Sequence, residues 1–185
     1  MKRVDFGIIL MIIFLGLLTI TCSDNSSGND DNENPQNGNV TFTVSGDSNG
    51  EKSGTAVFDV VEGGVTHFVE ISMWDNPSTF TLAFAVFSTD PLDVPTPGTY
   101  SIGQTDLNGE VFEADYTIAE ADDVLDYENY TTSYGEHGGT LTITESSENH
   151  IEGTFSLTVG KYDQEQDEYV GEITINDGEF YAIRD

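Results

Sequence analysis

The chain has 185 residues, which is enough for one domain of ordinary size and too few for two large ones. It carries 34 acidic and 5 basic residues, a formal net charge of −29. This charge argues against a nucleic-acid-binding protein and against a polybasic membrane-surface protein, because both need a basic face to meet an anionic partner. The single cysteine excludes an intramolecular disulfide and a cysteine-rich zinc site.

Residues 1–21 have the pattern of a secretory signal peptide. Lys2 and Arg3 supply positive charge, and residues 8–20 are nearly all apolar. An apolar helix of this length spans about 20 Å, which is short of the roughly 30 Å hydrocarbon core of a bilayer. The segment is therefore predicted to direct secretion, with an uncleaved signal anchor as the alternative.

The sole cysteine, Cys22, directly follows this segment. In the run LLTITC, residues 17–22, the chain resembles the precursor of a bacterial lipoprotein of the Bacteroidota type. Ile20 departs from the strict pattern, which has a small residue there. The resemblance implies diacylglyceryl and N-acyl lipid, such as palmitate, on Cys22, and an outer-membrane anchor facing the periplasm or the cell surface. One acyl chain holds a protein marginally, whereas two or three hold it durably. The alternative is an ordinary signal followed by an incidental cysteine.

Residues 22–39 are expected to form the lipidated cysteine and a disordered tether. The run 23–39 has no aromatic or aliphatic side chain, so it cannot bury enough apolar area to offset the entropy of ordering. Its acidic residues lack the EF-hand spacing, so no calcium site is assigned and no cofactor besides the lipid is predicted. Cleavage after residue 21 would leave a net charge of −30, with Lys52, Lys161 and Arg184 as the remaining bases. This excess predicts a fold that needs salt, and hence a saline habitat.

Residues 40–185 are expected to form a β domain, because apolar and polar side chains alternate with period two. The alternation is plain in residues 41–44, 55–60, 140–144, 154–159 and 172–175. Residues 65–74 and 79–88 are apolar on both faces, which favours central strands or strands covered on both sides.

Turn-forming residues separate these stretches. They lie at residues 47–50, 62–64, 75–77, 106–109 and 176–178. No long segment has helical periodicity. About nine short strands with such connections predict an all-β domain, either a single antiparallel β-sandwich or a small calycin-like barrel.

Four strand-like motifs give a second resemblance: GTY at 98–100, GTLTIT at 139–144, IEGTFSL at 151–157 and ITINDGEF at 173–180. In these motifs the chain is similar to a family of uncharacterised Bacteroidota lipoproteins. The resemblance implies an all-β secreted lipoprotein and implies no activity.

No catalytic motif is present. The sequence has no Gly-x-Ser-x-Gly elbow, no Walker loop and no dinucleotide fingerprint. The histidines, His67, His137 and His150, have no partner at a zinc-like spacing, and His67 is expected to pack or to cap. No catalytic residue and no metal site are predicted.

The most suggestive segment is 120–136, where Tyr127, Tyr130 and Tyr134 stand among carboxylates. Exposed tyrosines beside carboxylates stack on sugar rings and accept hydroxyl protons, or help to coordinate calcium. These tyrosines are the candidate ligand contacts. The alternative is a long solvated loop whose tyrosines cover an edge of the fold. Residues 161–169 form a second acidic stretch, predicted to be a hairpin tip.

The expected function is that of a membrane-anchored envelope lipoprotein acting as a non-enzymatic binding module. Its partners would be membrane lipid through the anchor and a glycan or protein, but no nucleic acid. The second hypothesis is a carrier of an apolar ligand, and the third is a polysaccharide hydrolase. A packed core should be filled by Phe58, Phe68, Phe80, Leu82, Phe84 and Phe155. A carrier would line a large cavity with them instead, and a hydrolase would need two carboxylates in a cleft.

Overall fold

The computed structural model describes residues 37–63, 65–75, 79–105, 107–120, 123–134 and 136–185. The signal peptide, Cys22 and most of the tether expected from the sequence lie outside these ranges. Residues 37–185 form one compact unit. Within the described ranges, no helix has the length and apolar character needed to cross a membrane.

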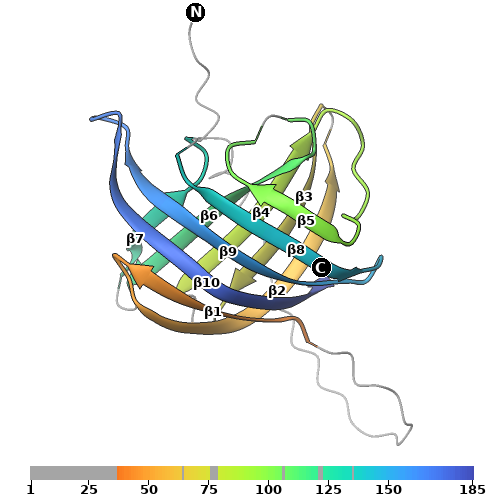
Figure 1. The fold of residues 1–185 in the computed structure, drawn as a ribbon, viewed down its shortest axis with the longest axis horizontal. Coiled ribbons are helices and arrows are strands. Elements are labelled where there is room, and N and C mark those ends of the chain that lie inside the picture. The colour runs from red at the N-terminus through yellow and green to blue at the C-terminus, as the bar shows by residue number, and fades with distance from the viewer. Residues whose placement is uncertain (1–36, 64, 76–78, 106, 121–122, 135) are drawn as a thin grey trace, which may run out of the picture. The chain divides into compact units, whose positions relative to one another are not determined.

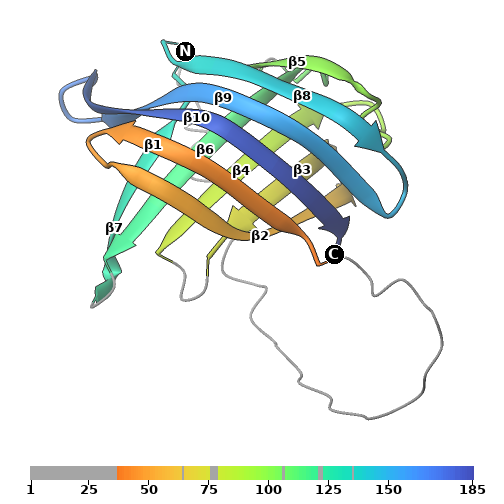
Figure 2. The same cartoon turned by 60° about the horizontal axis from the view of Figure 1, so that its bottom comes forward.

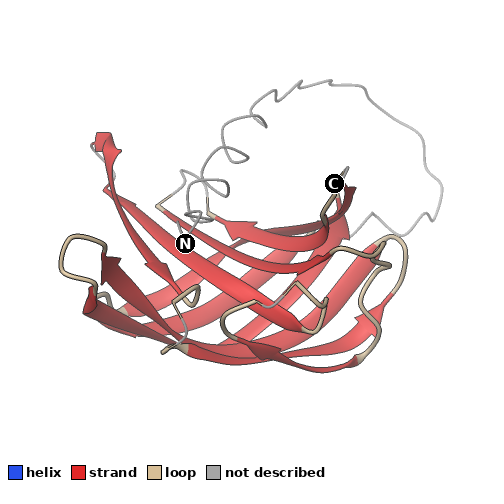
Figure 3. Cartoon of the chain, turned by 90° about the horizontal axis from the view of Figure 1, so that it is seen from above, coloured by secondary structure: helices blue, strands red, loops and turns tan. Residues whose placement is uncertain are grey.

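The described residues contain ten strands and no helix, so the all-β prediction is confirmed (Figure 3). The strands are β1 (Asn39–Gly46), β2 (Gly50–Glu62), β3 (His67–Trp74), β4 (Phe80–Ser88), β5 (Gly98–Ile102), β6 (Val111–Glu120), β7 (Asp123–Thr131), β8 (Gly138–Ser146), β9 (His150–Asp163) and β10 (Glu168–Arg184).

The ten strands form a single sheet that closes into a ring (Figures 1 and 2). Strands β1, β2, β3, β4 and β6 follow one another around it, and β8, β9 and β10 lead back to β1. The pairs are antiparallel except for two short parallel contacts, β5 with β6 and β10 with β2. One continuous sheet therefore surrounds one core.

Strands β5 and β7 complete the ring at different heights along β6. Strand β5 pairs with the first residues of β6 and with β8, whereas β7 pairs with the second half of β6. A single pair, Thr131 with Gly160, joins β7 to β9. After this pair the chain turns and continues as β8 along the same edge of β9.

Alternation places apolar side chains inside the ring and polar side chains outside it. In β1, for example, Val40, Phe42 and Val44 are buried, while their neighbours are exposed or half-buried. Rings from opposite walls meet in the interior. The Phe42 ring of β1 lies 5.1 Å from the Phe80 ring of β4 and 5.8 Å from the Phe155 ring of β9. Phe84 of β4 also lies 5.1 Å from Phe155. The interior is thus packed with aromatic side chains.

Five of the six residues expected to fill the core do so: Phe58, Phe80, Leu82, Phe84 and Phe155 are buried. Phe68 is the exception. It pairs with Phe87 across β3 and β4 on the outer face, with ring centroids 5.7 Å apart, because Val69 and Val86 occupy the inner positions. Apolar residues on both faces of β3 hide which face is inner.

Two further expectations are wrong in detail. Residues 176–178 do not end a strand. They form a bulge inside the 17-residue strand β10, where Asp177 has a φ of 53°. Residues 120–136 are not one long loop, because residues 123–131 form β7 and pair with β6. The hairpin tip expected within 161–169 is confirmed between β9 and β10.

Candidate functional site

Four aromatic side chains gather on the outer face where β9 and β10 extend beyond the core. We call this group, Tyr134, His137, Tyr162 and Tyr169, the aromatic platform. Tyr134 stacks on Tyr162 with centroids 3.9 Å apart and ring planes 13° apart. Tyr169 meets the rings of Tyr162 and His137 edge to face, at 5.2 and 4.2 Å. Such contacts each contribute about 0.5–1.5 kcal/mol beyond area burial.

The local sequence explains why these rings meet. Tyr162 and Tyr169 are a directly opposed pair across the β9–β10 hairpin. Gly160 lies beneath the rings of Tyr169 and His137. A Cβ atom there would stand 2.4 Å from the Tyr169 ring and 2.6 Å from the His137 ring. Only glycine therefore lets both rings rest on the strand. Tyr134 and His137 arrive from the turn that joins β7 to β8.

Polar groups surround the platform. The Gln164 amide donates to the Tyr134 hydroxyl at 3.4 Å, and the Tyr162 hydroxyl donates to Asp167. That hydrogen bond is the main reason why the pKa of Tyr162 is raised to about 12. His137 Nε2 lies 3.1 Å from a Glu172 carboxylate oxygen. The platform thus combines flat apolar rings with amide and carboxylate groups.

The structure separates the three tyrosines expected to act together. Tyr130 points into the ring, is buried, and donates a hydrogen bond to Glu128 at 3.1 Å. Tyr127 is 44% exposed on the outer face of β7, and Tyr134, 39% exposed, belongs to the platform. Tyr130 is therefore a core residue rather than a ligand contact. No pattern in the sequence indicates that Tyr162, Tyr169 and His137 are neighbours of Tyr134.

A second polar group lies on the outer face of β3, β4 and β6, where Glu70, Glu113 and Asp115 flank small alanines. Burial, and then the nearby Glu113 and Glu70 carboxylates, raise the pKa of Asp115 to about 7, against a hydrogen bond from Thr131. Burial also raises the pKa of Glu113, although Ser133 donates to it at 2.5 Å. These carboxylates face outward between neighbouring strands.

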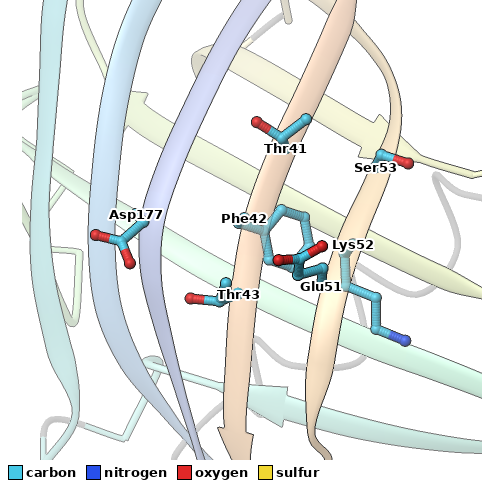
Figure 4. Close-up of a pocket in the computed structure, with 7 residues that line it drawn as sticks. All are labelled: Thr41, Phe42, Thr43, Glu51, Lys52, Ser53 and Asp177. Carbon is cyan, nitrogen blue, oxygen red and sulfur yellow. The ribbon is translucent and has the colours of Figure 1, made fainter.

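A shallow hollow of about 420 Å³ lies over β1 (Figure 4). Phe42 is the one apolar residue of its lining, and the others are polar: Thr41 and Thr43 of β1, Glu51, Lys52 and Ser53 of β2, and Asp177 of the β10 bulge. The Thr43 hydroxyl donates to the Asn176 carbonyl at 3.1 Å, which ties β1 to the bulge. The hollow is polar and therefore unsuited to an apolar ligand.

The basic residues occupy the opposite side of the sheet from most carboxylates. Lys52 is directly opposite Phe42 in the β1–β2 pair, so both lie on the inner face of the sheet. Its Nζ lies 6.0 Å from the Phe80 ring centroid. Lys161 is two residues beyond the inward-facing Val159 and pairs with Glu128 at 2.6 Å. Arg184 follows Ala182 on the inner register, 6.0 Å from the Phe58 ring. Hence no Lys or Arg of the described residues occupies an outward register position.

The histidines serve packing and local hydrogen bonding. His150 stacks on Tyr181 at 5.2 Å and contacts the Ser147 hydroxyl at 2.9 Å, at the tight turn between β8 and β9. His67 lies on the inner register of β3. No group of three or more metal-binding side chains occurs among the described residues.

Comparison of this chain with protein-family models, with curated proteins and with solved structures gives no match.

Proposed function

We propose that the protein is an envelope lipoprotein, anchored through Cys22, whose β domain binds its partner on the outer face of the ring. The role is non-enzymatic. One observation favours binding on the outer face over a carrier's inner cavity. Aromatic rings from opposite walls touch across the interior, at centroid distances of 5.1 Å for both Phe42–Phe80 and Phe84–Phe155. A carrier needs that space for its ligand.

The hydrolase alternative is disfavoured by the distribution of carboxylates. A glycosidase needs a carboxyl group with a raised pKa beside a second carboxylate, both lining the cleft that holds the substrate. The pKa is raised for Asp115 and Glu113 on β6, whereas the hollow is lined by Glu51 and Asp177 on β2 and β10. The raised pKa values and the hollow are therefore found on different parts of the sheet.

The anchor is tested with a Cys22→Ser variant expressed in a bacterium that processes lipoproteins. The wild type should incorporate labelled palmitate and sediment with the membranes, because two or three acyl chains hold durably. Cys22→Ser should incorporate none and leave the membrane fraction. A variant that stays membrane-bound through an intact N-terminus would show a signal anchor instead.

The closed interior is tested with the neutral apolar dye N-phenyl-1-naphthylamine. The folded protein should give no saturable rise in dye fluorescence, because aromatic rings in mutual contact occupy the described interior. A stoichiometric rise that a fatty alcohol displaces would replace the binding-module proposal with the carrier.

A further inference from the structure

We propose that the aromatic platform binds a neutral glycan by stacking a sugar ring on the exposed face of Tyr134. This inference rests on the proposed binding role and specifies its ligand. A pyranose ring offers C–H groups on its faces and hydroxyls at its rim. The platform offers a matching flat ring with polar groups at its edge, the Gln164 amide among them.

Exposed aromatic area of this kind is scarce in the described part of the chain. The large hydrophobic side chains exposed to solvent there are Val65, Tyr127, Tyr134 and Val170. Of these, Tyr134 has a second ring stacked parallel behind it, at 3.9 Å. The stack holds the exposed ring in one orientation, so little side-chain entropy is lost when a guest covers it.

The platform is rigid for a second reason. The Tyr169 and His137 rings rest directly on Gly160, and Tyr162 is held by Tyr169 and Asp167. One buried polar atom of the group, His137 Nδ1, has no hydrogen-bond partner among the described atoms. Buried polar side-chain atoms are usually paired, so an unpaired one calls for an explanation, such as a bound water or ligand.

Charge decides between classes of ligand. Glu172 and Asp167 contact the platform, and the full chain has a net charge of −29. Uronic-acid or sulfated sugars would be repelled. A cation would be attracted to any of the many outer carboxylates and would gain little selectivity here. A neutral sugar gains nothing from net charge and depends on the flat face, which places it at the platform.

The test is isothermal titration calorimetry on the mature lipoprotein in a detergent without a sugar head group. The titrants are short neutral oligosaccharides of glucose, mannose, galactose or xylose, with oligogalacturonate and oligolysine as charged comparisons. At least one neutral oligosaccharide should bind, equally well in low and high NaCl. Tyr134→Ala should weaken that binding about tenfold, Tyr134→Phe by less than about threefold, and Tyr127→Ala should leave it unchanged.

Each other outcome overturns the proposal. Absence of binding by every neutral oligosaccharide removes it, as does a loss on Tyr127→Ala that equals the loss on Tyr134→Ala. Salt-sensitive binding of oligolysine alone, weakened by Tyr134→Ala, would assign the platform to cationic partners and leave the proposed binding role intact. Failure of that role is recognised separately, by saturable uptake of N-phenyl-1-naphthylamine.

Discussion

The inner and outer faces of this sheet differ in almost every chemical property. The inner face is aromatic and aliphatic, with rings in mutual contact, as Phe155 shows by meeting Phe42, Phe84 and Phe180. The outer face carries mostly hydroxyls and carboxylates, with a few aromatic groups such as the Phe68–Phe87 pair and the aromatic platform. The bases are separated from the outer carboxylates, since Lys52 and Lys161 lie on the inner side of the sheet.

The two faces of this curved sheet therefore have different roles. The inner face supplies stability by burying apolar area, at about 25 cal/mol per Å². The outer face carries most of the acidic side chains and the aromatic platform. The proposed recognition site therefore lies on the face that contributes least to stability. Paired substitutions on the two faces test this division.

The largest effect is expected from opening the interior. Phe155→Ala removes a ring that touches three other rings and should lower the free energy of unfolding by about 3–5 kcal/mol, measured by urea denaturation. Phe87→Ala, on the outer face against Phe68, should cost less than about 1.5 kcal/mol. Equal losses for the two variants would contradict the division between faces.

A smaller effect is expected beneath the platform. Gly160→Ala places a methyl group 2.4 Å from the Tyr169 ring and should destabilise the protein by about 1–3 kcal/mol while displacing the tyrosine stack. Near-ultraviolet circular dichroism of the tyrosines reports that displacement. Gly98→Ala is the control, because its nearest new contact would be an ordinary 3.9 Å. An unchanged tyrosine signal in Gly160→Ala would show that Gly160 does not hold the rings in place.

The carboxylates of the outer face predict a pH dependence. The folded protein keeps the Asp115 proton up to about pH 7, whereas the unfolded chain releases it near pH 3.8. The contribution of Asp115 to the free energy of unfolding therefore falls as pH rises between these values and levels off above them. Asp115→Asn should gain stability over the wild type, by about 1–2 kcal/mol more at about pH 8 than at about pH 5, because Asp115 is half-buried and partly screened. The control is Asp59→Asn on β2, whose side chain is exposed, and an equal gain there would refute the assignment.

The smallest change is expected from salt. With the outer carboxylates unopposed by outward-facing bases, added NaCl should raise the thermal midpoint by several degrees, because screening acts over about 8–10 Å at physiological ionic strength. Choline chloride should act equally, since screening needs no specific cation. A flat midpoint would count against both the self-repulsion and the saline habitat inferred from the sequence.

Much of the fold follows from alternation read along the chain. The inner positions of Phe42, Phe155 and Ile173 were predictable because their neighbours are polar. Phe68 was not, because both faces of β3 are apolar. The bulge at Asp177 resembles a turn in the sequence, because the residues that allow a positive φ also end strands.

The candidate site was harder to predict than the fold. Its members come from a turn and a distant hairpin, so their sequence separation hides their contact. Only the opposition of Tyr162 and Tyr169 across a short hairpin was open to prediction. The proximity of Tyr134 depends on the single pair that joins β7 to β9, Thr131 with Gly160, which no local pattern specifies.

Native mass spectrometry of the protein, extracted gently from the cells that express it, tests most directly whether the ring is closed inside and binds only from outside. We predict the mass of the covalent chain alone, with no apolar molecule lost when the protein is then unfolded. A stoichiometric apolar molecule held in the folded protein and released on unfolding would contradict the account.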